Sequence, residues 1–541
     1  MNGWMTHLII VPVLLPLVSA AVMLLLNERR RVLKGAIGLT TTVTLLAVSL
    51  MLLHLADARP PGSGVSTYQL GDWPAPFGIV LVLDRLSALM LVLTSVLGVA
   101  TLIYSLARWH RAGPRFHTIF QLQLMGLNGA FLTGDLFNLF VFFEVLLAAS
   151  YGLVLHGDGT SRVRAGLAYI AINLTGSFLF LIGASLAYGV TGTLNMADLA
   201  ERVRTLSSED TALMAAAAAI LGTAFLMKAG AWPLNFWLPT TYAAASAPAA
   251  AMFAIMSKLG VYVILRLWTL VFGPDAGALA GFGGGWLLVI GMLTIIFGTV
   301  GILASQTLSR LAGCSVLISS GTLIAAIGTG GGPIIGSALF YLVSSTLGMA
   351  ALFLLVELVE RLRDPGADVL AVTMEAYGES DEAEPAEEVG VAIPATVALL
   401  GGSFIACALL LAGLPPLAGF IGKFGMMAAM LKTDGDTVRI SSWVLIALLT
   451  MSGLATLIAM TRSGISSFWA RMDDSIPRVR LIEMAPVVCL LLLGLGLTIG
   501  GGPAMRYMDA TMQALRSPQD YVTGVLSAPR AETSDARADL P

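Results

Sequence analysis

Four ionisable side chains interrupt long apolar stretches of this sequence. Glu144 lies in a run of Leu, Phe and Val, and Lys228, Lys258 and Lys423 lie in runs of similar character. A charge in the middle of a bilayer costs at least about 2.5 kcal/mol even on lenient insertion scales, so each such residue is a functional candidate. Because burial disfavours the charged form of an amine, a lysine in a hydrated cavity can take up and release a proton. These four residues are therefore our candidates for proton transfer.

Two of the lysines stand beside predicted helix breaks. Lys228 is followed by Gly230 and Pro233, and two consecutive prolines at 415–416 precede Lys423 within a glycine-rich stretch. Proline removes a backbone donor, and a broken helix at membrane depth is tolerated only where protein or a water-filled cavity surrounds it. Broken helices mark ion sites in transporters. The pattern therefore predicts an ion path at each break.

Each candidate also has a purely structural interpretation. Glu144 could form a packing salt bridge with a neighbouring helix, and Lys228 could reach the cytoplasmic interface. The prolines before Lys423 could only bend the helix, and the glycines could only allow close packing. Glu144 and Lys258, however, lie about halfway along their apolar runs, out of reach of either interface. We therefore favour the functional interpretation.

Other polar residues indicate capping or packing. Asp84, Arg85 and Asp135 fall at predicted helix ends, and the five histidines lie near helix ends or interfaces. The three cysteines lie in apolar runs without a Cys-x-x-Cys pair that could hold zinc or an iron–sulfur cluster. The sequence has no phosphate-binding loop, dinucleotide fingerprint or His-Glu-x-x-His motif. We therefore expect no metal and no cofactor, so that energy comes from an ion gradient or from a partner.

The elements that carry the four candidates are predicted membrane helices. Of 541 residues, 57% are hydrophobic and 12% are charged, which excludes a soluble body and implies a lipid bilayer as solvent. The net charge of −3 and the lack of a basic stripe give no sign of nucleic-acid binding. Apolar runs of about twenty residues recur, so the fold class is all-α polytopic membrane protein with about 14 transmembrane helices. The predicted helices are 5–26, 33–55, 79–107, 115–134, 136–156, 164–189, 211–230, 248–271, 285–305, 309–329, 334–358, a broken helix at 391–431, 440–462 and 482–500.

Charge distribution predicts how the chain is oriented and divided. Arg and Lys gather in loops on one side of the predicted helices, which assigns that side to the cytoplasm of a bacterial inner membrane and both termini to the outside. The acidic segment 375–388 contains no Lys or Arg and predicts a disordered linker. Two sets of five helices start from opposite sides, each with a broken helix, as in inverted-repeat transporters. The predicted units are helices 1–3 (1–114), a first repeat (115–271), a second repeat (285–462) with an acidic cytoplasmic linker (364–390), a last helix (463–500) and a polar tail (501–541).

Four stretches carry a resemblance to a known family: GDLFNLFVFFE at 134–144, KAGAWPLNFWLP at 228–239, Ser-Ala-Pro at 246–248 through Lys258, and GLPPLAGFIGKF at 413–424. Together they resemble the proton-pumping subunits shared by respiratory complex I and the multisubunit monovalent cation/proton antiporters called Mrp, Mnh or Pha. The resemblance implies that Glu144 pairs with Lys228 and that Lys258 relays protons toward Lys423 and an exit. It also implies other membrane subunits of an antiporter complex as partners, with protons and monovalent cations as substrates.

One position departs from the family pattern. Where many relatives carry a histidine or lysine in the tenth helix, this chain has Ser319 and Ser320. Hydroxyl groups and ordered water can link polar groups that are too far apart for direct contact. We expect them to bridge the middle of the relay.

The residues and the resemblance together predict a proton-translocating subunit of a Na⁺ or K⁺/proton antiporter, a secondary transporter rather than an enzyme. One alternative is a proton-pumping membrane subunit of a redox-driven complex, of the NADH:quinone oxidoreductase or hydrogenase type. Another is a non-transporting scaffold whose buried charges only lock helices together. Copurification with flavin or iron–sulfur subunits would favour the redox complex, whereas loss of assembly before loss of activity would favour the scaffold.

Overall fold

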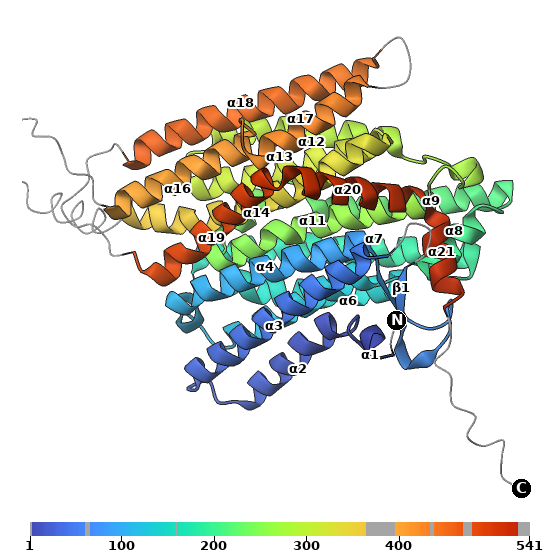
Figure 1. Cartoon of the computed structure of the whole chain (residues 1–541), viewed down its shortest axis with the longest axis horizontal. Coiled ribbons are helices and arrows are strands. Elements are labelled where there is room, and N and C mark those ends of the chain that lie inside the picture. The colour runs from blue at the N-terminus through green and yellow to red at the C-terminus, as the bar shows by residue number, and fades with distance from the viewer. Residues whose placement is uncertain are drawn as a thin grey trace, which may run out of the picture.

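The computed structural model describes residues 3–59, 65–157, 159–363, 395–432, 438–468 and 479–528. In this part of the chain, long helices lie side by side with roughly parallel axes (Figure 1). Twelve helices among the described residues are long and apolar enough to cross a membrane, and α2 (Val11–Leu25) and α17 (Ala418–Leu431) are shorter apolar helices. The all-α membrane fold predicted from the apolar runs is therefore confirmed.

The elements follow the predicted order along the chain. The first half contains α1 (Gly3–His7), α2, α3 (Arg31–Asp57), β1 (Ser66–Gln69), η1 (Leu70–Asp72), β2 (Val80–Leu83), α4 (Arg85–Ala107), η2 (Trp109–Arg111), α5 (Phe116–Leu132), α6 (Leu136–Leu155), α7 (Thr160–Thr191), α8 (Met196–Val203), α9 (Ser208–Ala229), α10 (Trp237–Ala244) and α11 (Ala247–Leu270). The second half contains η3 (Gly277–Leu279), α12 (Gly284–Ala304), α13 (Leu308–Gly328), α14 (Gly332–Arg363), α16 (Ala395–Ala412), α17, α18 (Ile440–Phe468), α19 (Leu481–Ile499), α20 (Gly501–Arg516) and α21 (Pro518–Leu526).

Three helices form the centre of the bundle. In each of α11, α13 and α14, 94% of the most apolar stretch is buried, whereas only 33% is buried in α3 and α19 at the periphery. Apolar residues on all sides are typical of a helix surrounded by other helices. A polar side chain on one of these three helices therefore faces protein rather than lipid.

Both predicted helix breaks are present. The chain leaves α9 at Ala229 and resumes as α10, and it leaves α16 at Ala412 and resumes as α17. The two sets of helices thus each contain one interrupted helix, as the glycines and prolines predicted. The inverted relation of the repeats and the boundaries of the predicted units stay predictions.

The start of the third predicted helix is a correction. Residues 79–84 were expected to be helical, but Val80–Leu83 form β2, which pairs antiparallel with β1. Alternating branched apolar residues favour a strand. Asp84 then begins α4 because its side chain accepts a hydrogen bond from Ser87 N in a capping box.

The described part of the polar tail forms two helices. Residues 501–526 form α20 and α21, and α20 contacts α14 and α11. Met508, Leu515, Tyr521 and Val525 are buried against the bundle. The tail needs no core of its own because its few apolar residues lie on the faces that contact the rest of the chain.

The first and last described elements lie at the same end of the bundle. α1 and α21 both contact β1 (Figure 1). An even number of membrane crossings places both ends of a chain on the same side of the membrane. The assignment of that side to the outside stays a prediction. The acidic segment 375–388 lies outside the described residues.

Candidate functional site

Lys228 occupies the last turn of α9, directly before the first break. Gly230 ends the helix with a φ of +70°, where an added Cβ would lie only 2.5 Å from Leu238 Cδ1. The backbone N–H of Trp232, freed by the break, donates to Thr294 Oγ1 of α12 at 2.9 Å. The donor freed by the interruption is thus satisfied by a neighbouring helix, as a broken helix inside a membrane requires.

Glu144 and Lys228 come from neighbouring helices but make no direct ion pair in this structure. Lys228 Nζ lies 5.1 Å from the centroid of the Phe143 ring, and Glu144 accepts a short hydrogen bond from Ser177 of α7. Successive residues on a helix point about 100° apart, so Phe143 faces Lys228 while Glu144 faces α7. Glu144 and Lys228 therefore lie on facing parts of the bundle without direct contact, separated by the Phe143 ring.

A cavity of about 20 Å³ borders Lys228. Tyr169, Trp237 and Gly260 also line it. About 10–15 Å³ is enough space for one water molecule. Lys228 therefore has room for a water molecule beside it, which a proton carrier needs.

Lys258 lies at the centre of the bundle. Its side chain is completely buried in α11, and its Nζ donates to Ser320 Oγ of α13 at 3.3 Å. Ser319, the preceding residue of α13, shares a hydrogen bond of 3.0 Å with Ser345 of α14. The serines at the position that departs from the family pattern therefore bond α13 to α11 and to α14.

Lys423 lies just after the second break. Gly413 ends α16 with a φ of +76°, and Lys423 Nζ donates to Ala412 O at 3.0 Å. The lysine is almost fully buried. The carbonyl group left free at the end of a helix is an acceptor with partial negative charge, which favours a cation at this place.

Tyr341 of α14 contacts both α13 and α17. Its side chain packs directly on Gly422, the residue before Lys423, and it interacts with Ser319 and Thr322 of α13. The sequence interpretation did not identify Tyr341 or Ser345. Neutral hydroxyl groups are common in membrane helices and cost little there, so no signal in the sequence separated them from packing residues.

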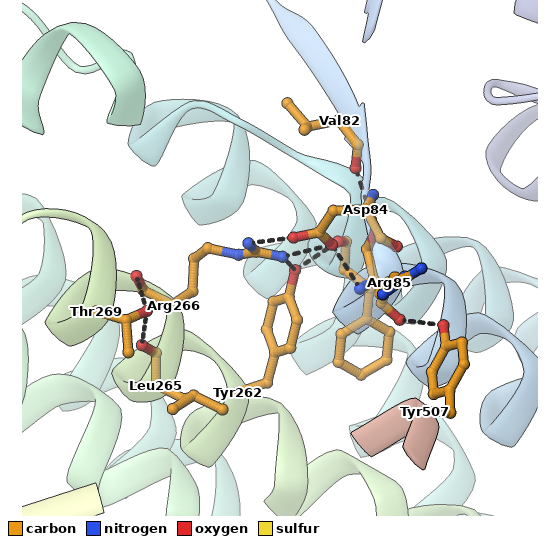
Figure 2. A network of polar contacts seen from close by, with 10 residues as sticks. Val82, Asp84, Arg85, Tyr262, Leu265, Arg266, Thr269 and Tyr507 are labelled. Carbon is orange, nitrogen blue, oxygen red and sulfur yellow. Dashed lines mark hydrogen bonds and ion pairs between the residues drawn. The ribbon is translucent and has the colours of Figure 1, made fainter. Parts of the chain in front are cut away.

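The residues that were expected to be caps have that role. Asp135 begins α6 by accepting a hydrogen bond from Asn138 N at 2.8 Å. Asp84 begins α4 and also binds Arg266 of α11, which donates to both of its carboxylate oxygens (Figure 2). Burial raises the pKa of Asp84, but the Arg266 charge and hydrogen bonds from Arg266 and Ser87 outweigh burial and hold that pKa below its usual value.

Arg266 was not among the functional residues predicted from the sequence. It lies within the apolar run of the helix that carries Lys258, eight residues further on, and this spacing was the available signal. Arg266 and Asp84 line a cavity of about 500 Å³ at the end of the bundle where α20 and α21 lie. Within the described residues, no group of three or more His, Cys, Asp or Glu side chains could hold a metal ion.

Comparisons with known proteins place this chain in a family. Residues 133–454 match the family described as NADH:quinone oxidoreductase/Mrp antiporter, TM. The chain is 60% identical to the D-type subunit of a probable K(+)/H(+) antiporter from Rhizobium meliloti (strain 1021), over 98% of this chain and 99% of that protein. It is 32% identical to the D-type subunit of a Na(+)/H(+) antiporter from Alkalihalophilus pseudofirmus, over 96% of this chain and 100% of that protein.

Solved structures agree with these matches. A chain in the structure of the Mrp complex from Dietzia sp. DQ12-45-1b superposes with a TM-score of 0.82 at 26% identity, over 97% of this chain and 100% of that chain. A chain of respiratory complex I from Thermus thermophilus superposes with a TM-score of 0.73 at 22% identity, over 94% of this chain and 99% of that chain, and shares the fold. The length of the chain and the residues around Glu144 predict the D-type subunit of the antiporter rather than its longer A-type subunit, and the matches confirm this. The chain therefore belongs to the NADH:quinone oxidoreductase/Mrp antiporter transmembrane family, in the branch of the D-type subunits of multisubunit cation/proton antiporters.

Proposed function

We propose that this chain is the proton-translocating subunit of its antiporter complex and that protons move along Lys228, Lys258 and Lys423. The interaction of Glu144 with Lys228 sets how readily that lysine holds a proton. The exchanged cation is K⁺, because the relative with 60% identity is named as part of a probable K(+)/H(+) antiporter. A Na⁺/H⁺ exchange is supported by relatives of only 32% identity.

The distribution of lysine supports this path. The chain has five lysines, and three of them are Lys228, Lys258 and Lys423 in the apolar helices. Lys34 pairs with Glu28 at 2.6 Å near a helix end, and Lys432 is exposed beyond the end of α17. A residue that is so costly in a membrane is not placed in three central positions for packing alone.

The observation that carries the proposal is the position of Lys258. Its buried amine donates to Ser320. The adjacent Ser319 bonds to Ser345 and interacts with Tyr341, which packs on Gly422, the residue before Lys423. A hydrogen-bonded line of hydroxyl groups, completed by water, can pass a proton without moving heavy atoms far. A scaffold that only locks helices would need no such line.

The test is cation-dependent proton flux in inverted vesicles from antiporter-deficient cells that express the whole complex. We expect Lys258→Ala and Lys228→Ala to abolish K⁺-dependent proton movement while the subunits still copurify. Lys432→Ala is the matched control, because it removes an exposed lysine, and it should leave the flux unchanged.

Three results would contradict the proposal. Normal exchange in both buried-lysine variants would remove these lysines from the proton path. Loss of copurification in the same variants, expressed at a low level, would instead favour the scaffold interpretation. Copurification of the wild-type chain with flavin or iron–sulfur subunits would favour a redox-driven complex.

A further inference from the structure

The cavity of about 500 Å³ at the end of the bundle where α20 and α21 lie brings a second polar surface close to the central helix α11. Asp84, Arg85, Arg266 and Gln513 are among the polar residues that line it. The distribution of Arg and Lys along the sequence assigns this end to the outside. The cavity has room for several water molecules and polar partners for them. We call it the outer cavity.

One face of α11 leads from the outer cavity to Lys258. Lys258, Tyr262 and Arg266 follow one another at a spacing of four residues, so they share a face of the helix with a rise of about 6 Å from each to the next. All three side chains are buried. A proton that moved along this face would pass between Lys258 and the outer cavity without reaching Ser320 or Lys423, and so without any link to cation exchange.

The directions of the hydrogen bonds close this face to protons. Arg266 Nη2 donates to the Tyr262 hydroxyl at 3.3 Å (Figure 2), and the Tyr262 hydroxyl donates to Phe131 O at 2.6 Å. A guanidinium group has five donors and no acceptor, and a main-chain carbonyl has no proton to pass on. The tyrosine hydroxyl therefore lies between a group that cannot take up a proton and a group that cannot release one.

Asp84 holds Arg266 in this arrangement. Both carboxylate oxygens of Asp84 accept hydrogen bonds from Arg266 (Figure 2), and the Asp84 side chain is itself fixed by Ser87 N at 2.8 Å. The guanidinium group also lies 5.3 Å from the centroid of the Tyr521 ring. A planar guanidinium bound at two atoms of one carboxylate has a fixed orientation. The third donor bond, to Tyr262, is therefore fixed as well.

We propose that Arg266, held by Asp84, is a seal that prevents protons in the outer cavity from reaching Lys258 by way of Tyr262. A hydrogen-bonded line conducts protons only where each member both accepts and donates, and Arg266 only donates. No proton is transferred at Arg266. The inference rests on the proposed function, because it needs Lys258 to carry protons. It adds the residue that closes one side of Lys258 and so prevents a proton leak that bypasses cation exchange.

The first experiment replaces the seal by a side chain that can relay protons. Arg266→His keeps a nitrogen donor for Asp84, but a neutral imidazole also has an acceptor. The purified complex is reconstituted in liposomes with a pH-sensitive dye, in a buffer without K⁺ or Na⁺ and with thiocyanate as the permeant counter-ion. After a pH step we expect proton leak about tenfold faster than in the wild-type complex.

Arg266→Lys is the matched control at the same position. It shortens the side chain and loses the two-atom contact with Asp84, as the histidine variant does, but a protonated amine still donates without accepting. We expect its proton leak to stay at the wild-type rate. Arg202→His is the control at another position, because Arg202 pairs with Asp198 at 3.0 Å in α8, which contacts α21, and does not line the outer cavity.

The second experiment tests the route of the leak. Lys258→Ala added to Arg266→His should return the leak to the wild-type rate, because the proton then has no buried amine to reach. The double variant Asp84→Asn with Arg266→Gln gives an independent check that leaves no buried charge unpaired. Its amides both donate and accept, so it should also leak faster than the wild-type complex.

The outcomes separate the inference from the proposed function. Equal leak in Arg266→His and Arg266→Lys would mean that packing, and not hydrogen-bond direction, is responsible, and the inference would be wrong. A wild-type leak rate in both Arg266→His and the amide variant, with normal copurification, or a leak that persists without Lys258, would also overturn it. In each of these cases the function stands if Lys258→Ala alone abolishes exchange. If Lys258→Ala retains full exchange, the function fails together with the inference.

Discussion

Arg266 and Asp84 form a buried ion pair in which Arg266 Nη2 lies 2.8 Å from Asp84 Oδ1 (Figure 2). Arg266 belongs to α11, about 12 Å beyond Lys258 along the helix, and Asp84 is the cap of α4. The Arg266 side chain also donates to the Tyr262 hydroxyl at 3.3 Å. This pair ties the helix that carries the central lysine to α4 at the end of the bundle where α20 and α21 lie.

Removal of one partner of this pair should destabilise the protein. Asp84→Ala leaves the Arg266 charge buried without its carboxylate, and Arg266→Ala does the converse, so each should cost about 3–5 kcal/mol. The loss of stability is measured by thermal unfolding of the purified complex, monitored as the fraction of protein that stays monodisperse. The double variant should lose less than the two single variants together, and strictly additive losses would contradict a direct interaction.

The same pair predicts the acid sensitivity of the fold. The pKa of Asp84 is lowered in the folded protein, so its contribution to stability is complete above the unfolded value near 3.9 and is lost as the pH falls through the lower folded value. We expect thermal stability from this pair to be constant between about pH 5 and 8 and to decline below about pH 4. Asp84→Asn should remove that part of the decline, and an unchanged acid profile in this variant would show that other carboxylates are responsible.

Lys258 should depend on its hydroxyl partner. Ser320→Ala removes the acceptor 3.3 Å from Lys258 Nζ and should slow K⁺-dependent proton flux about tenfold, whereas Lys258→Ala should slow it at least 100-fold, as expected for loss of a proton-transfer group. Flux in inverted vesicles measures both. Ser315→Ala is the control on the same helix, since its hydroxyl bonds to Leu311 O of its own helix. Equal losses in the two serine variants would argue for a general effect on α13.

Tyr341 should carry the step from Ser319 toward Lys423. Tyr341→Phe keeps the packing against Gly422 but removes the hydroxyl, and we expect a flux about tenfold lower with an unchanged apparent affinity for K⁺. The measurement is the flux at several K⁺ concentrations. A changed affinity at full maximal rate would place Tyr341 at a cation site instead of on the proton path.

Glu144 and Lys228 should be energetically coupled although they do not touch. Double-mutant analysis of Glu144→Gln and Lys228→Ala, using flux as the readout, should give an interaction of about 0.5–3 kcal/mol. Ser177→Ala removes the donor to Glu144 and should alter the effect of Glu144→Gln but not that of Lys258→Ala. Purely additive effects of Glu144→Gln and Lys228→Ala would mean that the carboxylate acts elsewhere, for example against a neighbouring protein of the complex.

Much of the fold follows from the sequence because the bilayer imposes a simple rule. A run of about twenty apolar residues can only be a helix, since every backbone group must be satisfied within the segment. The glycines and prolines at 230–233 and 413–416 fixed where two helices stop, because φ > 0 and the missing N–H are local properties. The rule failed at 80–83, where four apolar residues pair as a strand before α4 begins. It also says nothing of α20 and α21, which pack on helices distant in the chain.

The sequence by itself determined which side chains are expensive in a membrane, and this identified Glu144, Lys228, Lys258 and Lys423 without any knowledge of their neighbours. Only the tertiary structure decided what surrounds them: Ser320 at Lys258, Phe143 rather than Glu144 beside Lys228, and Tyr341 next to the residue before Lys423. The physical reason is that the cost of burying a charge is a property of one residue and its segment, and is therefore visible in the sequence. A hydrogen bond between neutral groups on separate helices depends on helix rotation and packing, which the order of residues does not reveal.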